Sequence, residues 1–162
     1  MNWQEICDNP VSHDLPFKIE TNQWGKIEMS PATNEHGIYR MSIGEWLMKL
    51  TGSGRTISEC SIQTTKGVKV ADVAWASYDF LGKNRHKTPY PESPEIVIEI
   101  LSPAPANSRQ EMQDKKRLYF AAGAKEIWLC GEDGTMAFFS AQGDLPESRI
   151  VAGFPERIDI DW

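Results

Sequence analysis

Cysteine is scarce in this sequence, and the few cysteines it has lie far apart. Cys7, Cys60 and Cys130 are the three present, and no CxxC pair occurs. An odd number of scattered cysteines argues against a disulfide framework and a zinc ribbon, and it suits a reducing cytosol. The three histidines are also scattered and form no HExxH motif, which disfavours a zinc site.

Long apolar runs are absent as well. The N-terminal residues MNWQEICDNPVSHDLP lack the apolar segment of a signal peptide. The longest apolar stretches, such as Ile96 to Leu101, fall far short of the roughly 20 residues that span a bilayer, and Glu99 interrupts this one. We therefore expect a soluble, cytoplasmic protein that does not insert into a membrane.

Positive charge is in short supply. Lys and Arg number 17 against 23 Asp and Glu, so the formal net charge is −6. Because affinity for phosphate depends on cationic contacts, this balance excludes a polycation that coats nucleic acid regardless of sequence. A nuclease with a local basic patch stays possible. The GxxxxGK[ST] and GxGxxG nucleotide loops and the GxSxG nucleophile elbow are absent.

The composition, 40% hydrophobic and 25% charged over 162 residues, predicts a single globular domain at 1–162 with its core at 16–140. Hydrophobic periodicity and turn residues predict its elements. Strands are expected at 16–21, 25–30, 57–64, 68–76, 95–101, 125–130 and 135–140, helices at 34–50 and 108–122, and a polar loop between 77 and 94. A capping box at Ser108 and Glu111 opens the second helix. This order predicts a mixed α/β (α+β) domain, in which helices flank a mixed β-sheet and a β-hairpin lies at the N-terminus.

Two acidic residues interrupt strands that are otherwise apolar. Asp72 lies within the strand 68–76, and Glu99 lies within the strand 95–101. An unpaired buried carboxylate is costly, so each acid must be protonated, paired with a cation or turned to solvent. If the two acids converge, their oxygens suit Mg²⁺ or Mn²⁺. Pairing with a Lys or Arg, or a place on a solvent-facing surface, is the alternative that the pattern leaves open.

Further candidates come from neighbouring elements. Lys115 lies four residues before Tyr119, so the two share one helix face. A lysine beside metal-bound carboxylates orients water or offsets charge on a phosphate, whereas a solvated helix surface is the simpler alternative. Glu20, at the end of the first strand, is a candidate for a further acid. His36, just inside the first helix, is a candidate neighbour of the site.

A basic loop follows the Asp72 strand. Residues 66–90 contain five Lys or Arg against two Asp, and Lys83, Arg85 and Lys87 lie close together. Such a loop beside an acidic strand is typical of a phosphate-binding edge near a metal site, although an ordinary surface also carries such charges. We expect these three residues to contact nucleic acid.

Several motifs follow one another in a fixed order along the chain. They are Glu20, the run GKIEMSP at 25–31, His36, VADV at 70–73, PEIVIEILSP at 94–103, the pair Asp114 and Lys115, Tyr119, Gly123 and EIW at 126–128. Together they span about residues 16–140 and resemble the Uma-two family of restriction endonucleases. That family is a branch of the PD-(D/E)xK nuclease superfamily.

The resemblance implies a restriction-endonuclease-like core and assigns roles to residues. Asp72 matches the acid of the PD element, and Glu99 matches the acid of the (D/E)xK element. The position two after Glu99 is Leu101 rather than Lys, and Lys115 of the following helix takes the place of that lysine. Glu20 matches a helper acid.

The implied activity is Mg²⁺- or Mn²⁺-dependent hydrolysis of phosphodiester bonds in DNA, carried out by a homodimer. Asp72 and Glu99 would hold the metal, and Lys115 would orient the attacking water. His36 and Tyr119 would contact these side chains without binding the metal themselves.

Two other functions stay open. Cys130 and Gly131 stand where the family usually has an Asp, and together with the net acidity this favours a catalytically inactive nucleic-acid-binding or assembly module of the same fold. A small-molecule phosphodiesterase is the third possibility. Convergence of Asp72, Glu99 and Lys115 is the observation that bears most directly on the choice.

Overall fold

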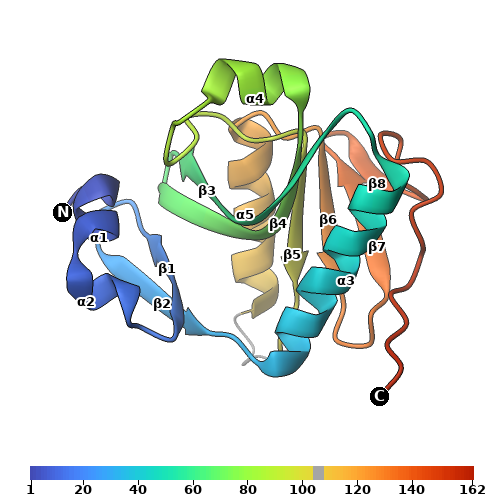
Figure 1. Cartoon of the computed structure of the whole chain (residues 1–162), viewed down its shortest axis with the longest axis horizontal. Coiled ribbons are helices and arrows are strands. Elements are labelled where there is room, and N and C mark those ends of the chain that lie inside the picture. Colours follow the sequence, from blue (N-terminus) through green and yellow to red (C-terminus); the bar gives the residue numbers. More distant parts are fainter. Residues whose placement is uncertain (104–107) are drawn as a thin grey trace.

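Six strands form the central sheet of the computed structural model, which describes residues 1–103 and 108–162 (Figure 1). In sheet order they are β3 (Gly54–Thr64), β4 (Gly67–Ser77), β5 (Ile96–Ile100), β6 (Glu126–Cys130), β7 (Met136–Ser140) and β8 (Gly143–Leu145). All neighbours are antiparallel except β5 and β6. A parallel pair needs a crossover, and α5 (Ser108–Ala121) lies in that connection. The predicted mixed sheet is confirmed.

A separate two-stranded hairpin lies beside this sheet. It consists of β1 (Phe17–Thr21) and β2 (Ile27–Pro31), which pair antiparallel close to the ranges predicted for them. Two short helices, α1 (Trp3–Asp8) and α2 (Pro10–His13), precede it and lie next to it in Figure 1. They were not predicted, because helices of this length are too short to show a hydrophobic period.

Helices cover both faces of the sheet. On one face lies α3 (Asn34–Leu50), whose Ile43 and Leu47, one turn apart, are fully buried against the sheet. On the other face, Tyr119 of α5 packs with Val97 of β5. The predicted helix over 34–50 and the predicted packing of the second helix on the sheet are confirmed.

The polar loop expected after β4 is wrong in its first part, where α4 (Tyr78–Asn84) forms. The Ser77 side chain accepts a hydrogen bond from the Phe80 N–H and so caps this helix, and Phe80 is buried beneath it. The helix is only seven residues long, too short to show a hydrophobic period. The proline-rich sequence that follows it is typical of a loop, so the N-cap residue Ser77 was not recognised as a helix start. The capping box predicted at Ser108 depends on a side chain that lies outside the described residues.

The cysteines are free, as the sequence predicts. Burial raises the pKa of the Cys60 and Cys130 thiols to about 12, so both stay protonated and act as small apolar core residues. Within residues 1–103 and 108–162, no helix has the length and apolar character needed to cross a membrane.

The pairing of β4 with β5 is short, and this determines where the hairpin sits. The two strands pair only from Trp75–Ile96 to Val73–Ile98, so the N-terminal half of β4 is not paired with β5. There β1 lies against β4, and the Val68 N–H donates to the Thr21 hydroxyl at 2.8 Å. Side chains of the hairpin thus satisfy backbone groups that a neighbouring strand would otherwise satisfy.

Docking of the hairpin depends on Gly67 in the turn between β3 and β4. Its φ is +88°, and a Cβ at this position would lie 2.5 Å from the Thr21 carbonyl oxygen and 2.6 Å from that of Asn22. We predict that Gly67→Ala lowers the free energy of unfolding by about 2 kcal/mol or more, because it adds both backbone strain and a clash. Urea denaturation followed by circular dichroism measures this.

Gly82→Ala is the matched control. Gly82 lies in α4, and nothing comes within 4 Å of a Cβ placed there. This substitution is expected to be neutral or to stabilise by up to about 1 kcal/mol, the helix propensity of Ala over Gly. Equal effects of the two substitutions would contradict the packing described for the hairpin.

Candidate active site

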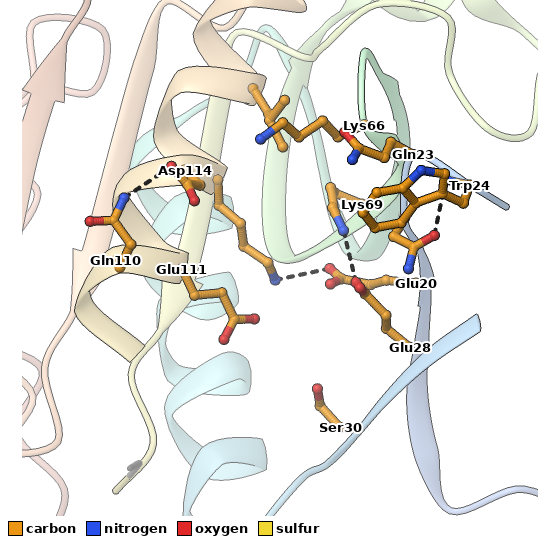
Figure 2. Close-up of a pocket in the computed structure, with 13 residues that line it drawn as sticks. Glu20, Gln23, Trp24, Glu28, Ser30, Lys66, Lys69, Gln110, Glu111 and Asp114 are labelled. Atoms are coloured by element: carbon orange, nitrogen blue, oxygen red, sulfur yellow. Dashed lines mark hydrogen bonds and ion pairs between the residues drawn. The ribbon is translucent and has the colours of Figure 1, made fainter. Parts of the chain in front are cut away.

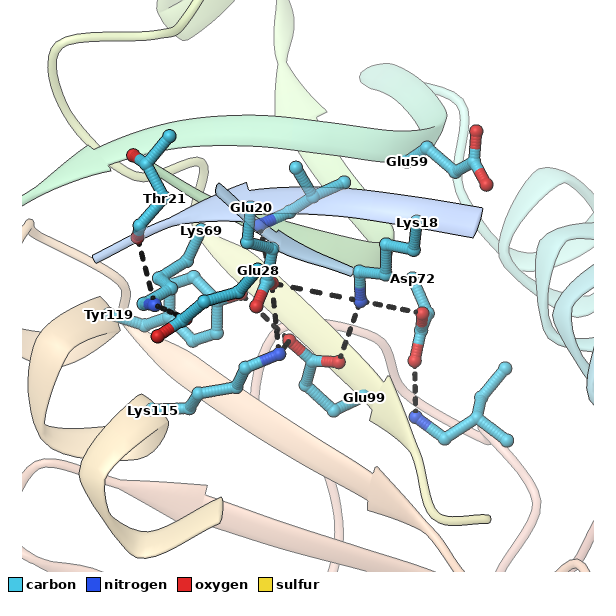
Figure 3. Close-up of polar contacts among 12 residues, drawn as sticks. Lys18, Glu20, Thr21, Glu28, Glu59, Lys69, Asp72, Glu99, Lys115 and Tyr119 are labelled. Carbon is cyan, nitrogen blue, oxygen red and sulfur yellow. Dashed lines mark hydrogen bonds and ion pairs between the residues drawn. The ribbon is translucent and has the colours of Figure 1, made fainter. Parts of the chain in front are cut away.

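Five charged side chains from four elements meet where the hairpin, the sheet and α5 come together (Figure 3). Three are carboxylates, namely Glu20 of β1, Asp72 of β4 and Glu99 of β5. Two are ammonium groups, namely Lys18 of β1 and Lys115 of α5. All of them are largely buried, with Asp72 and Glu99 only 1% and 2% exposed. We call these five residues the charged cluster.

Lys18 occupies the centre of the charged cluster. Its Nζ lies 2.9 Å from Asp72 Oδ1, 3.4 Å from Glu99 Oε2 and 3.9 Å from Glu20 Oε1. Lys18 is not among the residues predicted from the sequence, although its position carries a signal. Lys18 lies two positions before Glu20 in a strand, so the two side chains point to the same face.

Lys115 is the lysine of α5 that enters the charged cluster. Its Nζ lies 2.9 Å from Glu20 Oε1 and 3.5 Å from Glu99 Oε1. Its neighbour Lys116 points elsewhere, with its Nζ 3.7 Å from the centre of the Phe139 ring. The alternative of a solvated helix surface is therefore wrong for Lys115, which is 9% exposed.

Asp72 lies where β4 and β5 separate, and every polar contact it makes favours its charged form. Its Oδ2 accepts the Ile100 N–H at 2.8 Å, and its Oδ1 lies 3.2 Å from His36 Nε2 as well as near Lys18. Burial by itself raises the pKa of Asp72, but the His36 hydrogen bond, the Lys18 charge and the Ile100 N–H together lower it below its usual value. The other ring nitrogen of His36 lies 3.2 Å from Ser102 Oγ.

Glu99 is shifted in the opposite direction. Burial raises its pKa, Lys115 and Lys18 offset only part of this effect, and the nearby negative charges of Asp72 and Glu20 raise the pKa further. The Tyr119 hydroxyl donates to Glu99 Oε1 at 2.7 Å and fixes the carboxylate. Acids whose pKa values are driven apart in one place are typical of functional sites.

Glu20 contacts both a backbone amide of β4 and the ammonium group of Lys115. Its Oε1 accepts the Val70 N–H at 2.8 Å and contacts Lys115. Burial raises the pKa of Glu20, but Lys115, Lys18 and the Val70 N–H lower it below its usual value. Glu20 therefore stays ionised and holds the Lys115 ammonium against Glu99.

The donor set fits a small divalent cation. Asp72 Oδ1 and Glu99 Oε2 both contact the single Lys18 ammonium, so one cation lies within reach of both oxygens. Mg²⁺ usually takes one or two carboxylates from the protein and completes its shell with water and phosphate oxygens. Within the part of the chain that the structure describes, no group of three or more His, Cys, Asp or Glu side chains is arranged to hold a metal. A two-carboxylate site is consistent with that finding.

A cavity of about 630 Å³ opens beside the charged cluster, between the hairpin and α5 (Figure 2). Glu20 and Lys115 line its inner end, and the exposed ring of Trp24 lines its outer end. Six of the sequence-predicted residues come together in or against the charged cluster, namely Glu20, His36, Asp72, Glu99, Lys115 and Tyr119.

The basic residues after β4 do not join this group. Lys83 belongs to the last turn of α4, Arg85 caps that helix, and Lys87 Nζ contacts Asn84 Oδ1 at 3.2 Å. Among the described residues, none of the three lines the cavity beside the charged cluster. Their contact with nucleic acid stays a prediction.

Comparisons with known proteins support the fold and give the family. A crystal structure described as that of a "putative nuclease" from Anabaena variabilis superposes with a TM-score of 0.60 at 17% sequence identity, over 91% of this chain and 87% of that chain. At that identity the likeness shows a shared fold. No curated protein matches the sequence.

The sequence itself gives the family. Residues 13–160 match the family whose description is "Putative restriction endonuclease", and this range contains every member of the charged cluster. The chain belongs to this family, the Uma-two family of restriction-endonuclease-like proteins.

Proposed function

We propose that this protein is a Mg²⁺- or Mn²⁺-dependent endonuclease that hydrolyses phosphodiester bonds of DNA with a PD-(D/E)xK-type site. The observation that carries the proposal is the position of Lys18, whose ammonium contacts Asp72 and Glu99 together. Two acids from neighbouring strands are thus close enough to share one cation. Membership of a family described as restriction endonucleases supports the choice of nucleic acid as substrate.

In the proposed site, Asp72 and Glu99 are the metal ligands. A bound divalent ion would polarise the phosphodiester and lower the pKa of a coordinated water. Asp72 suits this role because its contacts keep it ionised. Tyr119 supports the second ligand, since its hydroxyl holds Glu99 Oε1 and leaves Oε2 directed toward Lys18.

Lys115 is the proposed positioning and charge-stabilising group. Burial lowers its pKa, but Glu99 and Glu20 raise it above its usual value, so the side chain remains an ammonium. A fixed positive charge beside the reacting phosphate offsets the negative charge that develops in the transition state. Glu20 holds this ammonium in place through its contact at 2.9 Å.

A catalytically inactive module of the same fold is the second candidate, and one observation favours it. The cavity beside the charged cluster is lined by more acidic than basic side chains, including Glu28, Glu111 and Asp114. A lining of that sign repels nucleic acid until cations bind.

Two further parts belong to the proposal of a nuclease. The protein would act as a homodimer, which sedimentation equilibrium tests, and Lys83, Arg85 and Lys87 would contact the nucleic acid.

Replacement of Lys115 tests the catalytic proposal. We predict that Lys115→Met lowers Mn²⁺-dependent cleavage of plasmid DNA by about 10² or more, the usual effect of losing one electrostatic stabiliser. Because Lys115 is buried and paired, stability should also fall by up to about 3 kcal/mol, and less if Lys18 compensates. Cleavage is therefore measured well below the melting temperature.

Lys116→Met is the matched control, since Lys116 directly follows Lys115 in α5 but its ammonium lies over the Phe139 ring, outside the charged cluster. Its cleavage rate should stay within about twofold of the wild type. Wild-type protein that cuts neither DNA nor RNA with either metal, alone or with cell extract added, would favour the inactive module.

Metal binding is tested separately from cleavage. Mn²⁺ at about 100 times Kd should add about 2.7 kcal/mol of stability to the wild type. Asp72→Asn and Glu99→Gln should each abolish this gain, because each removes one of two charged ligands. Thermal melts with and without Mn²⁺ provide the measurement.

Glu126→Gln is the control for losing a buried carboxylate. Glu126 lies on β6 and is 3% exposed, but its oxygens accept hydrogen bonds from Trp128, Ser148 and the Arg149 N–H away from the charged cluster. This variant should be less stable yet keep the full gain from Mn²⁺. An equal gain in Asp72→Asn and wild type would exclude Asp72 as a ligand.

A further inference from the structure

Lys18 stands where a metal ion would have to bind. Its Nζ contacts both Asp72 Oδ1, at 2.9 Å, and Glu99 Oε2, at 3.4 Å. Mg²⁺ bonds to carboxylate oxygens at about 2.0–2.1 Å, so an ion held by both acids would overlap the ammonium. Lys18 and the metal therefore cannot hold these two oxygens at the same time.

The net charge of the charged cluster explains why the Lys18 ammonium lies between the acids when no metal is bound. Three carboxylates in the charged cluster face two ammonium groups, so its formal charge is −1 with Lys18 and −2 without it. A buried carboxylate that loses its partner is strongly destabilising. Lys18 thus keeps the metal-free site folded, and a divalent ion would make its charge dispensable there.

Lys18 also differs from Lys115 in how it is held. Lys115 contacts Glu20 and the other oxygen of Glu99, Oε1, but among the described residues it forms no ion pair with Asp72, so it does not obstruct the position that Lys18 occupies. Lys18 comes from the hairpin, which lies outside the six-stranded sheet (Figure 1).

Space for a displaced Lys18 exists nearby. A second cavity, of about 370 Å³, is lined by Lys18 together with Val70 and Glu59. The Glu59 side chain lines this cavity, is 54% exposed and offers a carboxylate that already pairs with Arg40. The flexible four-carbon stem of a lysine allows its ammonium to change partners without a backbone shift.

We infer that Lys18 is a built-in cation that competes with the divalent metal for Asp72 and Glu99, so that metal binding requires its displacement toward the second cavity. The inference rests on the proposed function, because it assumes that these two acids are the metal ligands. It adds a residue that sets the metal affinity of the site and couples metal binding to the hairpin.

The test is Mn²⁺ binding, measured by calorimetry and by the electron paramagnetic resonance of free Mn²⁺, on full-length protein. Lys18→Met should bind Mn²⁺ at least about tenfold more tightly than the wild type, since no ammonium has to be displaced. Without metal, this variant should melt at a lower temperature than the wild type, and saturating Mn²⁺ should remove the difference.

Two further variants separate charge from folding. Lys18→Arg keeps a cation at this position and should bind Mn²⁺ no more tightly than the wild type. It replaces Lys18→Met as the test variant if Lys18→Met does not fold without metal, and tighter binding by Lys18→Arg would then contradict the competition. Lys69→Met removes another buried lysine at the hairpin, one whose ammonium contacts the Thr21 carbonyl and Glu28 rather than Asp72 or Glu99. Its Mn²⁺ affinity should be unchanged.

The outcomes distinguish the two claims. If the wild type binds Mn²⁺ and Lys18→Met binds it equally or more weakly, the competition is refuted while the proposed metal site stands. If neither protein binds Mn²⁺, the proposed site fails and the inference falls with it. Binding by Lys18→Met alone would support the competition in its strongest form.

Discussion

The early separation of β4 from β5 is the constraint on which the rest of the site depends. Beyond the pair Val73–Ile98, backbone N–H groups on both strands need acceptors, because a buried amide without one is costly. Carboxylates provide them: Asp72 accepts the Ile100 N–H, and Glu20 accepts the Val70 N–H. The same oxygens that complete the backbone hydrogen bonding thus become fixed, buried negative charges.

Those charges in turn require cations, and the chain supplies them from two sides. Lys18 arrives from the hairpin and Lys115 from the helix that crosses between the parallel strands β5 and β6. Lys115 bridges two acids and Lys18 bridges three, so the hairpin, the sheet and α5 are joined through one cluster. Stability and proposed function are therefore not separate properties here, since any ion that binds the acids must replace a contact that holds the fold together.

Much of this could be predicted from the sequence, for identifiable reasons. Asp72 and Glu99 are evident because a charged residue inside an apolar strand breaks a strong pattern, and Lys115 is evident because helix periodicity places it on the same face as Tyr119. Lys18 was missed because it alternates with Phe17 and Ile19 as an ordinary strand residue does. Its importance arises from tertiary contacts with residues 54 and 81 positions away, which no local pattern encodes. The same limit applies to Ser102, which meets His36 only through folding.

The most direct test of the account is a crystal structure of the protein soaked with Mn²⁺ and measured at a wavelength where Mn²⁺ scatters anomalously. The account predicts an anomalous peak bonded to Asp72 and Glu99 at about 2.1 Å from their oxygens, with the Lys18 ammonium moved out of contact with both acids. A peak elsewhere, or no peak with Lys18 still bridging the two carboxylates, would contradict it.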